Sequence, residues 1–435
     1  MSQPDDIKKL HFVFEWIGPR GPLPNGINPS LTDLADKSHG MTIDRACGKY
    51  ERQDSTFNVF KTLVPTTLNS VFSLPEKMFI YEIHLNHKTY FNSYFYNSIG
   101  LLDNYIIDPW VLEQIKRGAG KLLISYPLES FVDDDVFKSI HNYFYSNQIP
   151  LQNVIYLTNA PNGGDLYFDW CRRHNFEPEL NVEYAGLYLS DLMNHASDPE
   201  YQVPYVVGPR KKLFLNFNRR YRNQRLLFLL KVFNESGLLD KFSMSFSDMH
   251  PDSRESWLSH AQTIVRQYNL NMSDDQLNIL NSMLPLKLDN SDFTRFPMEE
   301  RIIDTKKFYD ESLVHVVSET NFFEPAIHIT EKTMKPILFK QPFIILGSRF
   351  SLKNLKDQGF KTFSSIWDES YDLEENSMIR MEKVLDVCKY IASMPEKELI
   401  KISKKAQPIV EYNFELLKEL KGKDAQRFLD KFGDY

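Results

Sequence analysis

The chain of 435 residues is long enough for two domains, and its 42% hydrophobic and 25% charged residues exclude a largely disordered protein. Its net charge of −7 at pH 7 excludes a general attraction to nucleic acid or anionic lipid. No apolar run approaches the roughly eighteen residues that a membrane span requires, so we expect no transmembrane segment.

The N-terminal residues and the spacing of the cysteines bear on the cellular compartment in which the protein is expected. The opening residues, MSQPDDIKKL, lack the apolar centre of a signal peptide. The three cysteines are too widely spaced for a disulfide framework (Cys47, Cys171 and Cys388). Both observations favour a reducing, cytoplasmic location.

The N-terminal half alternates short apolar β-prone runs with helical patterns. Strands are expected at 10–16, 78–83, 121–126, 153–160 and 182–189, and helices at 136–147 and 165–174. The strand–helix–strand spacing across 121–160 is typical of a βαβ unit, in which the strands are parallel.

A proline-rich segment without periodicity, 196–210, predicts an interdomain connection, and the alternation restarts after it. Strands are expected at 212–217, 241–247, 313–319, 342–347 and 360–363, and helices at 222–236, 253–285, 330–340 and 351–358. Ser273 and Gln276 form a capping-box pattern, and Pro336 should kink or shorten its helix. The domains are therefore expected at 1–205 and 206–375, followed by a helical segment at 376–435.

The strongest chemical signal is the stretch from Leu313 to Gly347. A strand ends near Glu319, and after a loop Thr330, Glu331 and Lys332 open a helix. Thr330 can cap the first turn, Lys332 can reach a phosphate drawn to the helix N-terminus, and Glu331 can accept hydrogen bonds from a ribose diol. The alternative is an ordinary capped helix start with an acid in its first turn.

A basic cluster, 210–225, contains no acidic residue. An anion site inside an acidic protein suggests a small phosphorylated ligand, and arginine suits bidentate contact with a diphosphate. The alternative is a solvated helix face. The basic residues are Arg210, Lys211, Lys212, Arg219, Arg220, Arg222 and Arg225.

The run HITEKTMKPILFKQPFIILG resembles the C-terminal motif of α1,3-fucosyltransferase-like enzymes, and KLFLNFNRRYRNQRLLFLL resembles the first strand and helix of their nucleotide-binding half. The resemblance covers roughly 210–365. It implies a GT-B glycosyltransferase: two Rossmann-like α/β domains with parallel sheets that face a central cleft, with C-terminal helices packing back on the first domain. It also implies an inverting, metal-independent hexosyl- or deoxyhexosyl-transferase with no cofactor beyond its GDP- or UDP-linked donor.

The resemblance also assigns residues to the donor. Arg225 best matches the arginine that contacts the pyrophosphate, with Arg219, Arg220 and Arg222 as competitors. The full expected donor set is Asn218, Arg220, Arg222, Arg225, Glu319, Thr330, Glu331 and Lys332. No metal site is expected, because no D-x-D motif stands at a convincing strand end.

The catalytic base and the acceptor contacts are expected in the N-terminal half, at the carboxyl ends of strands. Glu129 follows the strand at 121–126, and Glu15 is the runner-up, with Trp16 beside it as a sugar-stacking platform. Thr158 and Asn159 end another strand and can bind hydroxyl groups. A solvated loop carboxylate is the alternative for either glutamate.

The acceptor follows from family analogy alone, which favours a surface or capsular glycan. A hydroxymethylated base of phage-like DNA is a second acceptor, because DNA glucosyltransferases are also GT-B enzymes, although the acidity of the chain speaks against it. A non-catalytic sugar-nucleotide or glycan-binding protein is the alternative from another functional class. A GT-B-shaped sugar-nucleotide epimerase or hydrolase is a third option.

Overall fold

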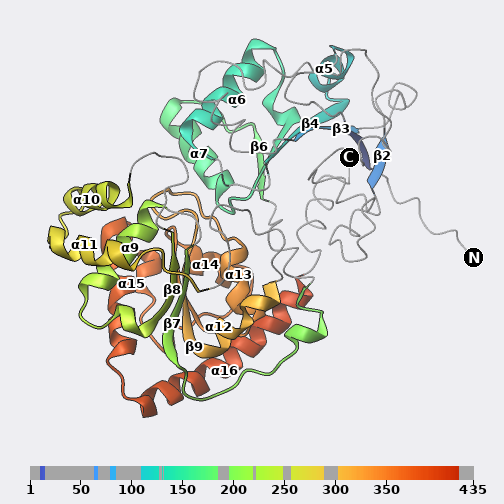
Figure 1. Cartoon of the computed structure of the whole chain (residues 1–435). Coiled ribbons are helices and arrows are strands. Elements are labelled where there is room, and N and C mark those ends of the chain that lie inside the picture. The colour runs from blue at the N-terminus through green and yellow to red at the C-terminus, as the bar shows by residue number, and fades with distance from the viewer. Residues whose placement is uncertain are drawn as a thin grey trace, which may run out of the picture. The chain divides into compact units, whose positions relative to one another are not determined.

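Figure 1 shows the chain as a computed structural model, which describes residues 10–14, 63–66, 79–84, 109–126, 130, 132–184, 195–218, 222–247, 256–288 and 302–420. The chain divides into two compact units, the second of which is His195–Glu419. Each unit contains a parallel sheet with helices. The expected fold class, α/β with parallel sheets, is confirmed.

The described strands of the first unit form one parallel sheet in the order β2-β1-β3-β4-β5-β6. Its strands are β1 (Leu10–Phe14), β2 (Leu63–Thr66), β3 (Phe79–His84), β4 (Gly120–Tyr126), β5 (Val154–Thr158) and β6 (Asn181–Tyr184). Its helices are α5 (Pro109–Lys116), α6 (Asp134–Ser146) and α7 (Gly163–His174), with the 3-10 turn η2 (Leu151–Asn153). The three α-helices lie on the same side of the sheet (Figure 1), as right-handed crossovers that advance in one direction require.

Helix α6 shows why this βαβ unit could be predicted. The carboxylate of Asp133 accepts a hydrogen bond from the backbone N–H of Val136 at 2.9 Å and so caps the helix. Val136, Ile140 and Phe144, four residues apart, are buried against the unit's core. The helix connects β4 to β5, which pair in parallel register from Leu122 with Val154.

The second unit, His195–Glu419, contains the parallel sheet β10-β9-β7-β8. Its described strands are β7 (Lys212–Asn218), β8 (Phe242–Phe246), β9 (Ser312–Ser318) and β10 (Phe343–Leu346). Its described α-helices are α9 (Asn223–Asn234), α10 (Trp257–Gln267), α11 (Asp274–Met283), α12 (Lys306–Glu311), α13 (Glu331–Leu338), α14 (Ser351–Asp357), α15 (Ser377–Ala392) and α16 (Glu396–Glu419). The 3-10 turns are η3 (Pro199–Tyr201), η4 (Leu239–Lys241), η5 (Ile302–Thr305) and η6 (Ser370–Leu373).

The central strand β9 is buried along its whole length, because helices cover both faces of this sheet. Helices α9 and α15 lie on one face, and α12, α13 and α16 lie on the other (Figure 1). The chain leaves β7 toward β8 and leaves β9 toward β10, which are opposite directions along the sheet. Right-handed crossovers therefore place α9 and α13 on opposite faces, with both N-termini at the carboxyl edge.

Two local predictions about helix ends can be checked directly. The capping box is present, since the N–H of Ser273 donates to Gln276 Oε1 at 2.9 Å and the N–H of Gln276 donates to Ser273 Oγ at 3.2 Å. Helix α13 continues past Pro336 but ends at Leu338, two residues before the expected end at 340. Pro336 lacks the N–H that the helix needs at this position.

The prediction of a strand at 360–363 is wrong, because the structure has no strand there. Both backbone polar groups of Lys361 pair with the carboxamide of Asn413 on α16, at 2.8 Å each. The N–H of Phe363 donates to the Glu369 carboxylate at 2.7 Å. Side chains from elsewhere in the chain satisfy this backbone, so it adds no strand to the sheet.

Residues 196–210 and 376–419 belong to the second unit. The ammonium group of Lys340 donates to the carbonyl of Val203 at 2.8 Å and lies 3.2 Å from the Glu411 carboxylate on α16. Glu411 in turn accepts from the N–H of Tyr205 at 2.8 Å. These contacts, centred on the buried Lys340, attach the segment after η3 to α16, so the segment packs within the second unit.

The contact between Asn413 and Lys361 gives a stability prediction. Asn413→Ala removes two hydrogen bonds from a side chain that is 1% exposed and leaves backbone groups without partners. We expect the free energy of unfolding, measured by urea denaturation, to fall by about 1–3 kcal/mol. Lys404→Ala, at an exposed position of the same helix, is the control and should change little. Equal stability of the two variants would contradict the assignment.

Candidate functional site

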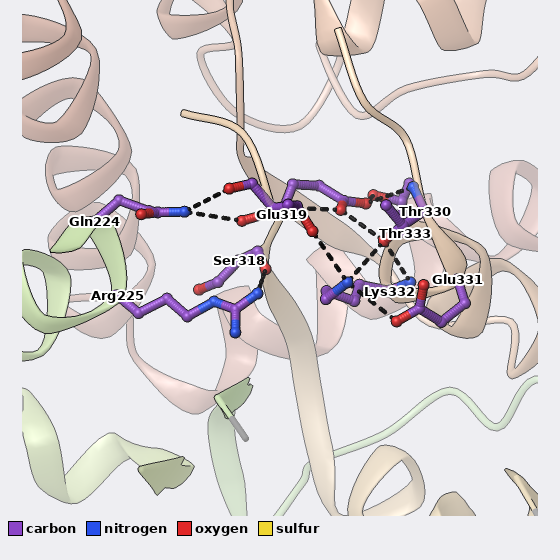
Figure 2. Close-up of polar contacts among 9 residues, drawn as sticks. Gln224, Arg225, Ser318, Glu319, Thr330, Glu331, Lys332 and Thr333 are labelled. Atoms are coloured by element: carbon purple, nitrogen blue, oxygen red, sulfur yellow. Dashed lines mark hydrogen bonds and ion pairs between the residues drawn. The ribbon is translucent and has the colours of Figure 1, made fainter. Parts of the chain in front are cut away.

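The candidate site lies at the carboxyl ends of β7 and β9, which are neighbours in the sheet of the second unit. Asn218 is the last residue of β7, Ser318 is the last residue of β9, and Glu319 directly follows β9. In open α/β sheets, ligands bind at this edge. The N-termini of α9 and α13 reach the same edge, as Figure 2 shows.

Glu319 fastens α13 to the end of β9. Its side chain is fully buried, and its carboxylate accepts four hydrogen bonds. The donors are the N–H of Thr320 (3.3 Å), the N–H and hydroxyl of Thr330 (3.0 and 2.7 Å) and the hydroxyl of Thr333 (2.6 Å). Thr330 also caps the helix as predicted, because its hydroxyl accepts from the N–H of Lys332 at 3.3 Å. Both oxygens of Glu319 are thus engaged in positioning the helix start.

The N-terminus of α9 is held to the same strand end through its side chains. Gln224 donates to the carbonyls of Glu319 and Thr320 at 3.3 and 2.8 Å, and Arg225 donates from Nη2 to the carbonyl of Ser318 at 3.2 Å (Figure 2). Arg225 is only 3% exposed. Residues 318–320 therefore connect the first turns of two helices that lie on opposite faces of the sheet.

Lys332 and Glu331 stand at the start of α13. The ammonium group of Lys332 lies 3.0 Å from Glu331 Oε1, 3.0 Å from the Thr330 hydroxyl and 3.4 Å from the Thr320 hydroxyl. The side chains of Lys332 and Glu331 are 27% and 37% exposed. Burial alone raises the pKa of Glu331, but the charges of Lys332 and Lys335 outweigh it and lower the pKa to about 2. The carboxylate is therefore ionised at neutral pH.

Cations at the N-termini of both helices influence the buried His328. It is 3% exposed, and burial is the main reason that its pKa is lowered to about 3. The charges of Lys332 and Arg222 lower the pKa as well, and Glu331 opposes them. Arg222 precedes α9 and Lys332 lies in the first turn of α13, so both positive charges act on one imidazole.

Asn218 belongs to a buried polar network at the same edge. Its carboxamide N–H donates to Asn216 Oδ1, and Asn216 donates to Ser318 Oγ at 3.0 Å. Asn218 is 1% exposed, and within the described part of the chain its carbonyl oxygen has no hydrogen-bond partner. This oxygen can still accept a hydrogen bond at the end of β7, where we expect a contact with the nucleotide sugar.

The acceptor-side residues Thr158 and Asn159 lie at the end of β5 in the first unit, and both are buried. Thr158 packs against Gly163, the first residue of α7. A Cβ on Gly163 would lie 2.9 Å from Thr158 Cγ2 and 3.3 Å from Val132, so the close approach of α7 to β5 requires glycine there. Acceptor binding by Thr158 and Asn159 remains a prediction.

Five residues named for the site lie outside the described residues: Glu15, Trp16, Glu129, Arg219 and Arg220. Conversely, sequence reasoning missed Gln224, Thr320 and Thr333, which hold the site together. Thr333 stands one helical turn after Thr330, and that spacing was the available signal. Gln224 and Thr320 have no local pattern that distinguishes them.

Two absences are confined to the ranges that the structure describes. No group of three or more His, Cys, Asp or Glu side chains there could hold a metal ion. No helix within those ranges is long and apolar enough to cross a membrane.

Comparison with protein-family models gives no match, and comparison with curated proteins gives none either. Among solved structures, the chain is similar to an α,α-trehalose-phosphate synthase (UDP-forming) from Burkholderia vietnamiensis, at 11% identity and a TM-score of 0.39, over 90% of this chain and 78% of that one. It is also similar to a trehalose-6-phosphate synthase, at 9% identity and a TM-score of 0.37, over 97% and 98% of the two chains. The resemblance to α1,3-fucosyltransferase-like enzymes remains a prediction.

The buried His328 gives a pH prediction. Because its pKa is lower in the folded protein than the ordinary 6.5, the unfolded chain binds a proton first as the pH falls, and stability is lost below about 6.5. His328→Gln removes this contribution. Between about pH 7 and pH 5, the wild type should therefore lose about 1–2 kcal/mol more unfolding free energy than the variant.

Urea denaturation at several pH values measures this difference. The buried His141 and His315, whose pKa values burial lowers to about 4 and 3, contribute equally to both proteins. Parallel pH profiles for the wild type and the variant would contradict the burial of a neutral imidazole at this site.

Proposed function

We propose that the chain is a glycosyltransferase of the GT-B type, which binds a GDP- or UDP-linked sugar at the carboxyl edge of the second unit's sheet. The observation that carries this proposal is the arrangement in Figure 2, where residues 318–320 join the first turns of α9 and α13. Helix N-termini favour negative charge, and two of them with Arg222 and Lys332 nearby suit a diphosphate.

Each donor contact has a chemical reason. Lys332 would bind a phosphate oxygen, and Glu331, ionised and partly exposed, would accept hydrogen bonds from a ribose diol. Arg220, Arg222 and Arg225 are the arginines proposed for the diphosphate. The carboxamide oxygen of Asn218, which has no hydrogen-bond partner among the described residues, would accept from a hydroxyl group of the nucleotide sugar. Glu319 and Thr330, engaged with each other, would serve the donor by holding α13 in place.

In the proposed reaction, an acceptor hydroxyl attacks the anomeric carbon of the donor sugar. The bond between that carbon and the phosphate oxygen breaks, and its electron pair leaves with the nucleoside diphosphate. Lys332 and the arginines stabilise this leaving group, while a carboxylate takes the acceptor proton. We propose inversion of configuration and no requirement for a metal, with Glu129 or Glu15 as the base.

The proposed acceptor is a surface or capsular glycan. A hydroxymethylated DNA base remains the alternative acceptor, although the net charge of −7 disfavours a polyanion. A non-catalytic sugar-nucleotide-binding protein is the alternative from another class. Turnover separates the enzyme from the binding protein, and the substrate that supports it identifies the acceptor.

A panel of UDP- and GDP-linked sugars, screened by thermal shift, tests the proposal first. Sugars that stabilise the protein are then assayed for hydrolysis and for transfer, with and without excess EDTA. We expect turnover that survives chelation. Stabilisation without turnover would favour the binding protein, and activity that chelation abolishes and Mn²⁺ restores would contradict the metal-independent mechanism.

The start of α13 gives a prediction about donor affinity. Lys332→Ala and Glu331→Ala should each weaken nucleotide-sugar binding by about 1–3 kcal/mol, because each removes a charged hydrogen bond to the donor. Isothermal titration calorimetry measures the affinity. Lys353→Ala, an exposed lysine at the start of α14 paired with Asp357, is the matched control and should bind normally. If both test variants bind the nucleotide sugar with unchanged affinity, residues 330–332 only cap the helix and the donor-site assignment is contradicted.

The proposed base gives a prediction about rate. Glu129→Gln keeps the shape of the side chain and removes its basicity, so kcat should fall by about 10²–10⁴-fold while donor affinity is kept. Glu15→Gln is the paired variant. Near-normal turnover of Glu129→Gln would eliminate Glu129, and a large loss in Glu15→Gln would move the role there. If both stay active, anomeric NMR of the product decides whether the reaction is retaining instead.

A further inference from the structure

Arg380, in the first turn of α15, is a buried cation that holds three separate segments of backbone. It is 4% exposed, and its guanidinium donates to four carbonyl oxygens. Nε donates to Gly347 at 3.1 Å, Nη1 donates to Glu374 at 2.7 Å and Glu375 at 3.4 Å, and Nη2 donates to Phe322. The guanidinium also lies over the Phe322 ring, 4.7 Å from its centroid.

Burying the charge of Arg380 costs free energy, so the burial needs an explanation other than formation of α15. Burial lowers the pKa of Arg380. The nearby charges of Asp372 and Glu374 act in the opposite direction but are the smaller effect. A buried charge is tolerated when hydrogen bonds satisfy it, and here backbone carbonyls do most of that work. Only a planar, forked donor can reach carbonyls that lie in several directions.

Two of the segments that Arg380 holds form the surroundings of Glu319. Phe322 lies in the loop that connects Glu319 to Thr330. Gly347 follows β10 and lies against Glu319, since a Cβ on Gly347 would come within 3.5 Å of the Glu319 Cβ. The next residue, Ser348, donates from its hydroxyl to the carbonyl of Ala326 in the same loop, at 2.8 Å. Arg380, which lies outside the candidate site, thus holds the loop after Glu319 and the turn at Gly347 together.

We infer that Arg380 is a positioning residue for donor binding, which acts by holding the 320–329 loop and the Gly347 turn around Glu319. The inference rests on the proposed function, because it assigns Arg380 to the affinity of the same site. Arg380 itself would not touch the donor. Its loss should free the loop, loosen the attachment of α13 to β9 and weaken the donor complex, while the chemical step in the assembled complex proceeds as before.

The test compares Arg380→Lys with Arg349→Lys. Lysine keeps the charge at 380 but cannot reach all the carbonyls. Arg349 is the matched control, because it donates to the neighbouring carbonyl of Leu373 at 3.0 Å and is 39% exposed. For Arg380→Lys we expect the donor KM to rise about three- to thirtyfold with kcat nearly unchanged. Peptides across 320–329 should also exchange amide hydrogen faster, with no ligand present.

A second variant separates positioning from general destabilisation. Arg380→Ala should recover donor affinity when free guanidinium ion is added at concentrations too low to unfold the protein. Asn413→Ala, whose contacts lie on α16, should lose stability and keep its donor affinity. An unchanged KM in Arg380→Lys, unchanged loop exchange, or an equal affinity loss in Asn413→Ala would each overturn the inference.

The exchange measurement needs no donor, so it distinguishes this inference from the proposed function. If the wild type binds no nucleotide sugar but Arg380→Lys still loosens the loop, the proposed function fails and Arg380 holds the loop for another reason. If the wild type binds a donor and the loop exchange and KM do not change, the proposed function stands and the positioning inference fails.

Discussion

A buried carboxylate at the end of β9 is the constraint on which the candidate site depends. Glu319 is fully buried, and among the described residues its hydrogen bonds come from amides and hydroxyls, not from a cation. A buried carboxyl group is tolerated in such a place only if hydrogen bonds engage both of its oxygens. The partners at Thr330 and Thr333 are available only when α13 starts where it does. The requirement to satisfy one buried carboxyl group therefore fixes a helix N-terminus at the edge of the sheet.

The electrostatics of the site follow from that placement. The first turn of α13 brings its own positive end and Lys332, and the attachment of α9 through Gln224 and Arg225 brings a second helix start to residues 318–320. The neutral His328 beside Lys332 and Arg222 adds no further positive charge at neutral pH. The two helix N-termini, with Arg222 and Lys332, therefore bring positive charge to this edge, and the ionised Glu331 offsets part of it. Such a small, localised group of charges on an acidic protein suits a compact diphosphate better than an extended polyanion.

Local sequence patterns predicted much of this edge. Thr330 as a helix cap, the strand before Glu319 and the α/β alternation all follow from short-range rules on propensity, periodicity and capping. Gln224 and Arg380 could not be recognised, because their partners are backbone carbonyls distant in sequence. The prediction of a strand at 360–363 was wrong for the same reason, because Asn413, 52 positions away in the sequence, pairs with the backbone of Lys361. Long-range partners override local propensity at such places.

In the proposed donor complex, the diphosphate of a nucleotide sugar binds at the N-termini of α9 and α13. A crystal structure of the full chain with UDP or GDP would locate the diphosphate. We expect its density at the first turn of α13, with Lys332 and at least one arginine of the 219–225 segment within hydrogen-bond distance. A nucleotide bound elsewhere, with Lys332 still engaged only with Thr320, Thr330 and Glu331, would contradict it.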